Sequence, residues 1–285
     1  MGFKGFVIGS IGNGDSVVSA GTAGAIDVVA GFDAVATANG TSGGITGSFA
    51  TFANCTHLRK LGLEENRLSG AVPSDLRRLS NLQRLSLSSN QLVSGSSVTI
   101  PILAALHNCT KLNILLIHDN YLSGYLPEQL PTNLSWLSVD GNRITGRIPS
   151  SFANLTNLRD LYMSSNLLTG RIPSSLRSLG NLQRLFLDNN KLKGSIPREI
   201  GEMKSLGELS ASHNMLTGQI PDTIGRLQQL THLVLNNNQL SGNVPASLGK
   251  CYNLQLLDLS NNQLRGRIPN EVASLPNLQF CLICP

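Results

Sequence analysis

The sequence is poor in charged residues, in aromatic residues and in long apolar runs. Of its 285 residues, 14% are charged and 5% are aromatic, with a single Trp, whereas an average soluble domain has roughly 25% charged residues. So few aromatic side chains argue against a large, aromatic-rich enzyme core. No apolar stretch approaches the roughly 20 residues that a membrane-spanning helix needs, so we expect no membrane span in this sequence.

The positive net charge is not concentrated in any one place. The chain has 22 basic and 17 acidic residues, which gives +5, and no run of Lys and Arg is longer than two. A nucleic-acid interface needs clustered cations that displace counterions. The sequence therefore predicts no nucleic-acid partner.

Leucine is absent from the first 57 residues, which hold 12 of the 28 Gly. From there on Leu recurs in ten units, the last of them cut short by the end of the sequence. The spacing between units is 24, 30 and 22 residues, and then 24 six times. The Leu that open the units are Leu58, Leu82, Leu112, Leu134, Leu158, Leu182, Leu206, Leu230, Leu254 and Leu278.

Each unit follows one pattern, LxxLxLxxNxLxGxIPxxLxxLxx, as in Leu182–Ser205. Alternate residues of a strand point to opposite faces, so the two Leu of LxL share one side. One unit cannot bury this Leu face alone, and stacked units share a continuous core. The pattern predicts short parallel strands, one from each unit, in a single sheet.

This pattern resembles the plant-type leucine-rich repeat, a family found in receptor-like kinase ectodomains, receptor-like proteins and polygalacturonase-inhibiting proteins. The resemblance covers residues 58–285. It implies an α/β-type repeat solenoid, a right-handed superhelix with a parallel sheet on its concave face and short 3-10, helical or irregular segments on its convex face. We expect residues 1–44 to be a Gly/Ala-rich head, flexible or a single degenerate coil, and residues 45–285 to form the solenoid. Secreted relatives usually carry a signal peptide and Cys-paired caps, and neither is visible here.

An Asn stands at the ninth position of every full unit. A turn inside a solenoid buries backbone groups that need partners, and a side-chain amide both donates and accepts hydrogen bonds. We therefore predict a structural ladder formed by Asn66, Asn90, Asn120, Asn142, Asn166, Asn190, Asn214, Asn238 and Asn262.

The five cysteines fall mostly at positions that hold Leu or Met in other units. Cys55, Cys109 and Cys251 lie three residues before an opening Leu, and Cys281 replaces the second Leu of a strand. We predict that these four thiols fill the core as small hydrophobic groups. The sequence leaves the state of Cys284 open.

The unit between Leu82 and Leu112 has six extra residues, four of them in or beside the polar loop Val93–Thr99. Insertions in solenoids lie in loops, which are often functional. A tolerated surface loop is the alternative.

No arrangement of residues indicates catalysis, a cofactor or a metal. The protein-kinase signatures and the common metal and nucleophile motifs are absent, and the five His show no ligand spacing. The sequence therefore predicts a protein that is not an enzyme. Kinase activity would need a domain that this sequence does not contain.

The strand positions between the Leu point to the concave side. Most hold small or polar residues, but the middle units place apolar and aromatic residues there, flanked by charges. Aromatic residues and Arg dominate binding hot spots, so we predict a peptide or protein ligand on this face. The alternative is that these side chains only shield the sheet. The predicted contacts are Ile114, Leu116, His118, Trp136, Asp140, Tyr162, Arg184, Phe186, Asp188, His232 and Val234.

The resemblance implies two functions, and a scaffold with no ligand of its own is the alternative to both. The first is a receptor-like module that recognises a protein or peptide, and the second is a secreted inhibitor of a cell-wall glycosidase. The first implies a ligand, with a co-receptor as a further partner, and an extracellular or plasma-membrane-associated location. Five sequons fit export and N-glycosylation: Asn39, Asn54, Asn108, Asn133 and Asn154.

Overall fold

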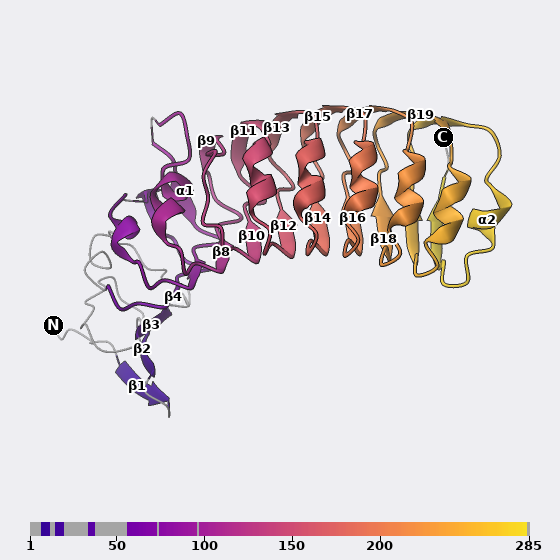
Figure 1. Ribbon diagram of the computed structural model, residues 1–285. Helices are drawn as coiled ribbons and strands as arrows, with labels where there is room; N and C mark the ends of the chain where they lie inside the picture. The colour runs from indigo at the N-terminus through magenta and orange to yellow at the C-terminus, as the bar shows by residue number, and fades with distance from the viewer. Residues whose placement is uncertain are drawn as a thin grey trace. The chain divides into compact units, whose positions relative to one another are not determined.

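The computed structural model describes residues 7–11, 15–19, 34–37, 56–72, 74–95 and 97–283. The chain divides into two compact units, with the boundary between Arg143 and Ile144. We refer to them as unit 1 and unit 2. Each contains stacked coils, and each coil adds one short strand to a parallel sheet (Figure 1).

Unit 1 contains four coils whose strands β4, β6, β8 and β10 pair in parallel. A second small sheet forms where the chain leaves each main strand, and there β5 pairs with β7 in parallel. The elements of these coils are β4 (Lys60–Gly62), β5 (Ser69–Ala71), η2 (Ser74–Arg78), β6 (Arg84–Ser86), β7 (Gln91–Val93), α1 (Pro101–Ala105), η3 (Leu106–Asn108), β8 (Ile114–Leu116), β9 (Ser123–Tyr125) and β10 (Trp136–Ser138).

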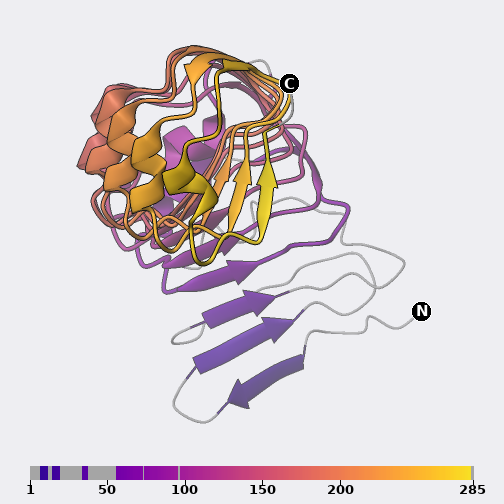
Figure 2. The same cartoon turned by 90° about the vertical axis from the view of Figure 1, so that its right-hand side faces the viewer.

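Unit 2 repeats the same coil with a constant period. Its main sheet has the order β12, β14, β16, β18, β20, β22, and the odd-numbered strands from β11 to β21 belong to the second sheet. Viewed along this stack, the main strands lie on one side and the short helices on the opposite side (Figure 2). The main strands are β12 (Asp160–Tyr162), β14 (Arg184–Phe186), β16 (Glu208–Ser210), β18 (His232–Val234), β20 (Leu256–Asp258) and β22 (Phe280–Leu282).

The remaining elements of unit 2 complete its coils. The second-sheet strands are β11 (Arg143–Arg147, which crosses the unit boundary), β13 (Leu167–Gly170), β15 (Lys191–Gly194), β17 (Met215–Gly218), β19 (Gln239–Asn243) and β21 (Gln263–Arg265). The helical turns are η4 (Ser150–Asn154), η5 (Ser174–Ser178), η6 (Arg198–Glu202), η7 (Asp222–Arg226), η8 (Ala246–Lys250) and α2 (Asn270–Ala273). These parallel strands and short 3-10 turns confirm the predicted fold class.

The Leu pattern produces the core of each coil. In the coil that opens at Leu182, the side chains of Leu182, Leu185, Leu187 and Leu192 are fully buried. Burial of one such side chain stabilises the fold by roughly 1.5–3 kcal/mol. The Pro of the Gly-x-Ile-Pro element, Pro197 in this coil, forms the N-cap of the 3-10 helix, where its fixed φ and missing donor carry no penalty.

The Asn at the ninth position ties each coil to its neighbour. Asn190 Nδ2 donates to the carbonyl oxygens of Met163 (3.0 Å), Leu187 (3.1 Å) and Asp188 (3.1 Å), and its Oδ1 accepts from the backbone N–H of Leu168 at 2.9 Å. The same bonds recur along both units, for example at Asn214. Eight of the nine Asn are buried, and Asn262 is partly exposed.

The residue just before each ladder Asn adopts a left-handed backbone. Eight non-Gly residues there have φ between 50° and 56°, and Gly141 has φ 59°. A bulky or β-branched residue is strained in this region, whereas Asn, Asp, His and Gly tolerate it. The constraint explains why polar residues that are not β-branched precede most of the ladder: Glu65, Ser89, Asp119, Ser165, Asn189, His213, Asn237 and Asn261.

A second ladder, which the sequence analysis missed, lies just before the opening Leu. Asn181 Nδ2 donates to the carbonyl oxygen of Thr156 at 2.9 Å, and Asn253 Nδ2 donates to that of Gln228 at 2.8 Å. Asn81 and Asn277 make the same bond to the residue 25 positions earlier. These amides join the turns that enter the main strands.

The head contains more strand than the sequence indicates. β1 (Val7–Ile11) pairs antiparallel with β2 (Asp15–Ser19), and β3 (Ala34–Thr37) pairs in parallel with both β2 and β4. The β1–β2 pair belongs to residues 1–44, for which the sequence predicts a flexible head or a single degenerate coil. The division of the chain at residues 44 and 45 stays a prediction.

The structure confirms two of the predicted core thiols and corrects a third. Cys109 and Cys251 are fully buried. Cys281, expected in the core, is exposed, because its strand β22 has a neighbouring strand on one side only among the described residues. Cys55 and Cys284 lie outside the described residues. No helix in the described ranges is long and apolar enough to cross a membrane.

The Asn ladder leads to a stability prediction. We expect Asn190→Ala to lower the free energy of unfolding by about 2–4 kcal/mol, because it leaves buried backbone groups of two coils without partners. Urea unfolding followed by circular dichroism measures the change. Lys191→Ala, at the exposed neighbouring residue, is the matched control and should shift stability by less than about 0.5 kcal/mol. Equal effects of the two variants would contradict the role of the ladder.

The thiols lead to a prediction about pH. Burial raises the pKa of Cys251 to about 11, from an ordinary value of 9.0. The folded state therefore favours the neutral thiol, and this contribution to stability is present below pH 9 and is lost as the pH rises toward 11. We expect wild type to lose more stability than Cys251→Ala between pH 8 and pH 10.5.

The exposure of the thiols can be tested by alkylation. Iodoacetamide at pH 8 should label Cys281 and spare Cys251 until urea is added. Labelling of Cys251 before Cys281 would contradict the burial of Cys251 and the exposure of Cys281.

Candidate ligand-binding face

Outward-pointing side chains of the main strands form rows, because the strands pair in register. We call these rows the strand face, and we describe it separately in each unit. In unit 1 one row runs Lys60, Arg84, Ile114, Trp136, and a second row runs through Leu116 and Ser138. Five of the predicted contact residues lie in unit 1.

Four of these five are half-buried on the strand face: Ile114, His118, Trp136 and Asp140. His118 Nδ1 lies 3.0 Å from Asp119 Oδ2, and Asp140 Oδ2 accepts a hydrogen bond from Ser138 Oγ at 2.8 Å. Ile114 and Trp136 are in-register neighbours. They offer apolar area that a ligand can cover.

The structure corrects the expectation that Leu116 is exposed. Its side chain is only 8% accessible although it points to the strand face. In register it lies between Ser86 and Ser138, and Arg84 and Trp136 are its diagonal neighbours. Long and aromatic side chains reach across such a diagonal, so Leu116 lies too deep to serve as a large contact.

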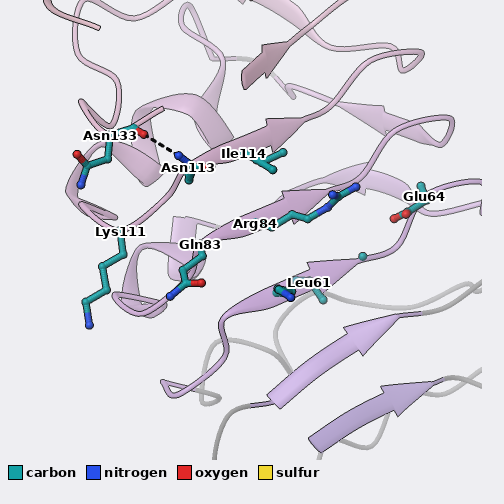
Figure 3. A pocket seen from close by; sticks show the side chains of 10 residues that line it. Leu61, Glu64, Gln83, Arg84, Lys111, Asn113, Ile114 and Asn133 are labelled. Atoms are coloured by element: carbon teal, nitrogen blue, oxygen red, sulfur yellow. Dashed lines mark hydrogen bonds between the residues drawn. The ribbon is translucent and has the colours of Figure 1, made fainter. Parts of the chain in front are cut away.

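A groove on unit 1, with a volume of about 780 Å³, was missed by the sequence analysis (Figure 3). It crosses β4, β6 and β8, and cations and amides dominate its lining. In Figure 3 Gln83 and Lys111 extend at one end, and Arg84 and Glu64 lie toward the other. The lining residues are Lys60, Leu61, Gly62, Glu64, Gln83, Arg84, Lys111, Asn113, Ile114 and Asn133.

The signal that could have revealed this groove is the row of third-position residues. Lys60 and Arg84 lie 24 residues apart in the sequence and side by side in the sheet. Along the chain, no run of Lys and Arg is longer than two. Cations that gather across strands do not appear in such a count.

In unit 2 the strand face carries an aromatic pair. Tyr162 and Phe186 are in-register neighbours on β12 and β14. Their ring centroids are 4.8 Å apart and their planes cross at 76°, an edge-to-face contact. Both side chains are half-buried. The pair is a preformed apolar surface with little freedom left to lose on binding.

An ion pair lies next to the aromatic pair. Arg184 Nε is 2.5 Å from Asp160 Oδ1, and the Asp160 side chain is 11% exposed while that of Arg184 is 41% exposed. Partial burial acts to lower the pKa of the Arg184 guanidinium, but the charge of Asp160 and the hydrogen bond to it outweigh this and raise the pKa. Arg184 therefore stays cationic and is held in one orientation.

Asp188 is held by the protein itself. Its carboxylate accepts hydrogen bonds from the hydroxyls of Ser164, Ser210 and Ser212 and from the backbone N–H of Ser212. These hydrogen bonds join three neighbouring coils. Because the Asp188 carboxylate is already engaged, we expect it to contribute less to ligand binding than its position on the strand face indicates.

The last two predicted contacts, His232 and Val234, lie on β18 and are half-buried. Thr231 Oγ1 lies 2.9 Å from His232 Nδ1. A hollow of about 600 Å³ is lined by Arg184, Glu208 and Thr231 among others. The third-position row presents Asp160, Arg184, Glu208 and His232 in order, and Arg184 and Glu208 in this row line the hollow.

Within the described ranges, no group of three or more His, Cys, Asp or Glu side chains could hold a metal ion. Several polar groups of the strand face, among them Asp140, Asp160 with Arg184, and Asp188, are paired or hydrogen-bonded, and they flank apolar surface. Such a face provides shape, charge and hydrogen bonds to a ligand.

Comparison with known proteins defines the class. The family description "Leucine rich repeat" matches residues 49–92 and 132–192, and a second leucine-rich repeat description matches residues 81–106, 205–227, 229–251 and 253–275. The chain belongs to the leucine-rich repeat family.

The similar proteins include receptors of plants. The chain is 39% identical over 87 residues to the receptor kinase-like protein Xa21 of Oryza sativa subsp. japonica, which is 30% of this chain and 8% of Xa21. The plant peptide hormone receptor RGFR1, solved in complex with RGF2, has a TM-score of 0.79 and 33% identity over 90% of this chain and 40% of that one. A plant ice-binding protein has a TM-score of 0.67 and 30% identity over 81% of this chain and 75% of that one.

The chain spans less than half the length of both receptors. The ice-binding protein shows that the same fold serves other functions, because function depends on the residues placed on a fold. The side chains of the strand face must therefore carry the functional argument.

The ion pair leads to a prediction. We expect Arg184→Met to lower the free energy of unfolding by about 1–2 kcal/mol, because it leaves the nearly buried Asp160 carboxylate without its partner, less than for a fully buried pair. Urea unfolding at pH 7 measures it. The double variant Asp160→Asn/Arg184→Met should recover most of the loss, since no charge is then left unpaired. A double variant that is less stable than both single variants would contradict this account.

Proposed function

We propose that this chain is a recognition module of the plant receptor type and binds a peptide or protein on the strand face. The observation that carries the proposal is the Tyr162–Phe186 pair next to the fixed Arg184 in unit 2. Aromatic side chains and Arg dominate hot spots because they bury a large area at a small entropic cost. The chain itself takes no part in catalysis.

The geometry supports this function because the contact groups are already in place before a ligand binds. The aromatic rings hold each other edge to face, and Asp160 orients the guanidinium of Arg184. A preorganised surface loses less conformational entropy on binding, which raises affinity. In unit 1, Ile114 and Trp136 are in-register neighbours that provide an apolar surface of the same kind.

The comparisons favour this function over a glycosidase inhibitor. Xa21 is named as a receptor kinase-like protein, and RGFR1 is a peptide hormone receptor with its peptide bound. By analogy, the partners of this chain are a secreted peptide or protein and, as a further step, a co-receptor. An extracellular or membrane-associated location follows from the same analogy.

Export would expose the sequons to glycosylation. Asn108 and Asn154 lie at the ends of η3 and η4 and are exposed. Asn133 is also exposed, but its side chain donates to the carbonyl oxygen of Thr110. We propose Asn108 and Asn154 as the preferred glycan sites. Asn39 and Asn54 lie outside the described residues.

A peptide library tests the proposed function. Random 12-residue peptides displayed on phage are selected on the full chain, and the affinity of an enriched peptide is then measured by calorimetry. We expect Phe186→Ala or Trp136→Ala to weaken it at least about tenfold, the effect of losing one hot spot of about 1.4 kcal/mol. Circular dichroism checks that each variant is folded.

Tyr252→Ala is the matched control. Tyr252 is 63% exposed and lies in the turn after η8, away from the strand face, so the affinity should stay unchanged. The proposal is wrong if no peptide is enriched, or if Phe186→Ala and Trp136→Ala both leave the affinity unchanged.

A further inference from the structure

We propose that the groove of unit 1 binds an anionic group of the peptide ligand, a carboxylate or an ester-linked sulfate or phosphate. The proposal rests on the proposed function only in taking the ligand to be a peptide. The groove lies over β4, β6 and β8 (Figure 3), where the sequence analysis placed a single contact residue, Ile114.

Positive charge is concentrated in this groove. Its lining holds three cations, Lys60, Arg84 and Lys111, against one acid, Glu64, so its formal charge is 3 − 1 = +2. The whole chain carries +5 over 285 residues. A hollow lined by one sign of charge focuses the field and attracts the opposite charge.

Two of the cations start from directly neighbouring backbone positions. Lys60 and Arg84 are in-register neighbours on parallel strands, and such strands lie about 4.8 Å apart. Side chains that start at this backbone spacing can direct donors to the oxygens of one carboxylate or ester group. Arg84 is half-buried, whereas Lys60 is exposed, so an anion at this place is partly shielded from water.

Donor capacity remains after the internal contacts are counted. Lys111 Nζ donates to Asn81 Oδ1 at 2.7 Å, and an ammonium group has three donors. By contrast, the backbone N–H groups at this edge are used, since those of Asn113 and Ile114 both donate to the carbonyl oxygen of Gln83. Recognition in the groove must therefore come from side chains.

The other lining residues fit a peptide better than another polyanion. The side-chain amide of Gln83 can donate and accept, which matches the backbone of an extended peptide. The amide of Asn113 already donates to the carbonyl oxygen of Asn133 at 3.3 Å and accepts from Ser135 Oγ at 2.9 Å, so it adds one further N–H donor. Ile114 offers an apolar contact for a side chain. No aromatic ring lines the groove within the described residues, so it lacks a surface on which a sugar ring or a base could stack.

Binding of short fluorescent probes to the full chain tests the proposal by anisotropy. The probes are hexaglutamate, amidated hexaglutamine, a hexapeptide with one phosphoserine, and an oligogalacturonate as a polyanion without a peptide backbone. We expect hexaglutamate or the phosphoserine peptide to bind and hexaglutamine not to bind. Which of the two acidic peptides binds more tightly distinguishes a carboxylate from an ester-linked anion.

Variants then locate the site. Arg84→Gln should weaken the bound probe about tenfold, the loss of one charge-assisted hydrogen bond. Lys60→Gln at the exposed neighbour should weaken it about threefold. Arg77→Gln is the matched control, because Arg77 is exposed on η2, is not among the lining residues and changes the net charge equally.

Three results would overturn the proposal. They are no binding of either acidic peptide, an equal loss with Arg77→Gln, or tighter binding of the oligogalacturonate than of both acidic peptides. If the acidic probes do not bind while Phe186→Ala still weakens the affinity of a library peptide, only the proposal of an anion site in the groove is wrong. If the acidic probes bind and no library peptide is enriched, the anion site in the groove is supported and the proposed function is wrong.

Discussion

The hydrogen bonds of the ninth-position Asn are the constraint on which the rest of the structure depends. Every coil must turn away from its strand while it is packed between neighbours, and the turn carries backbone groups that water cannot reach. One amide, such as Asn190, bonds to carbonyl oxygens of its own coil and of the preceding coil and accepts from a backbone N–H. Because an unpaired buried group costs about 1–3 kcal/mol, the spacing from Asn to Asn fixes how each coil sits on the next.

Stacking of this kind separates stability from recognition. The Leu and the Asn point inward and satisfy the core and the turns, so the outward residues of each strand are free to differ. This freedom lets one unit carry the Tyr162–Phe186 pair and the other carry the cationic groove. Rigid strands position these groups in advance, and a preorganised surface loses less conformational entropy on binding.

Outward polar residues nevertheless have two different roles. Asp188 and Asp160 are engaged by Ser hydroxyls and by Arg184, so they hold neighbouring strands together and orient a side chain that can meet a ligand. The cations of the groove keep donor capacity, and they face a hollow of about 780 Å³. Carboxylates that are already paired within the protein, such as Asp160 and Asp188, stabilise the strand face. The cations of the groove, which keep donor capacity, are the charges that can select a ligand.

The sequence by itself determined the period, the core and the ladder, because these depend on residue types at fixed offsets. It also placed Tyr162 and Phe186 on the outward side, since alternation along a strand needs no tertiary information. Only the tertiary structure decided that Leu116 is buried, that Cys281 is exposed, and that Lys60, Arg84 and Ile114 line one groove. Burial depends on what a neighbouring strand places beside a residue, and adjacency across strands joins residues 24 or 30 positions apart, which a count along the chain does not bring together.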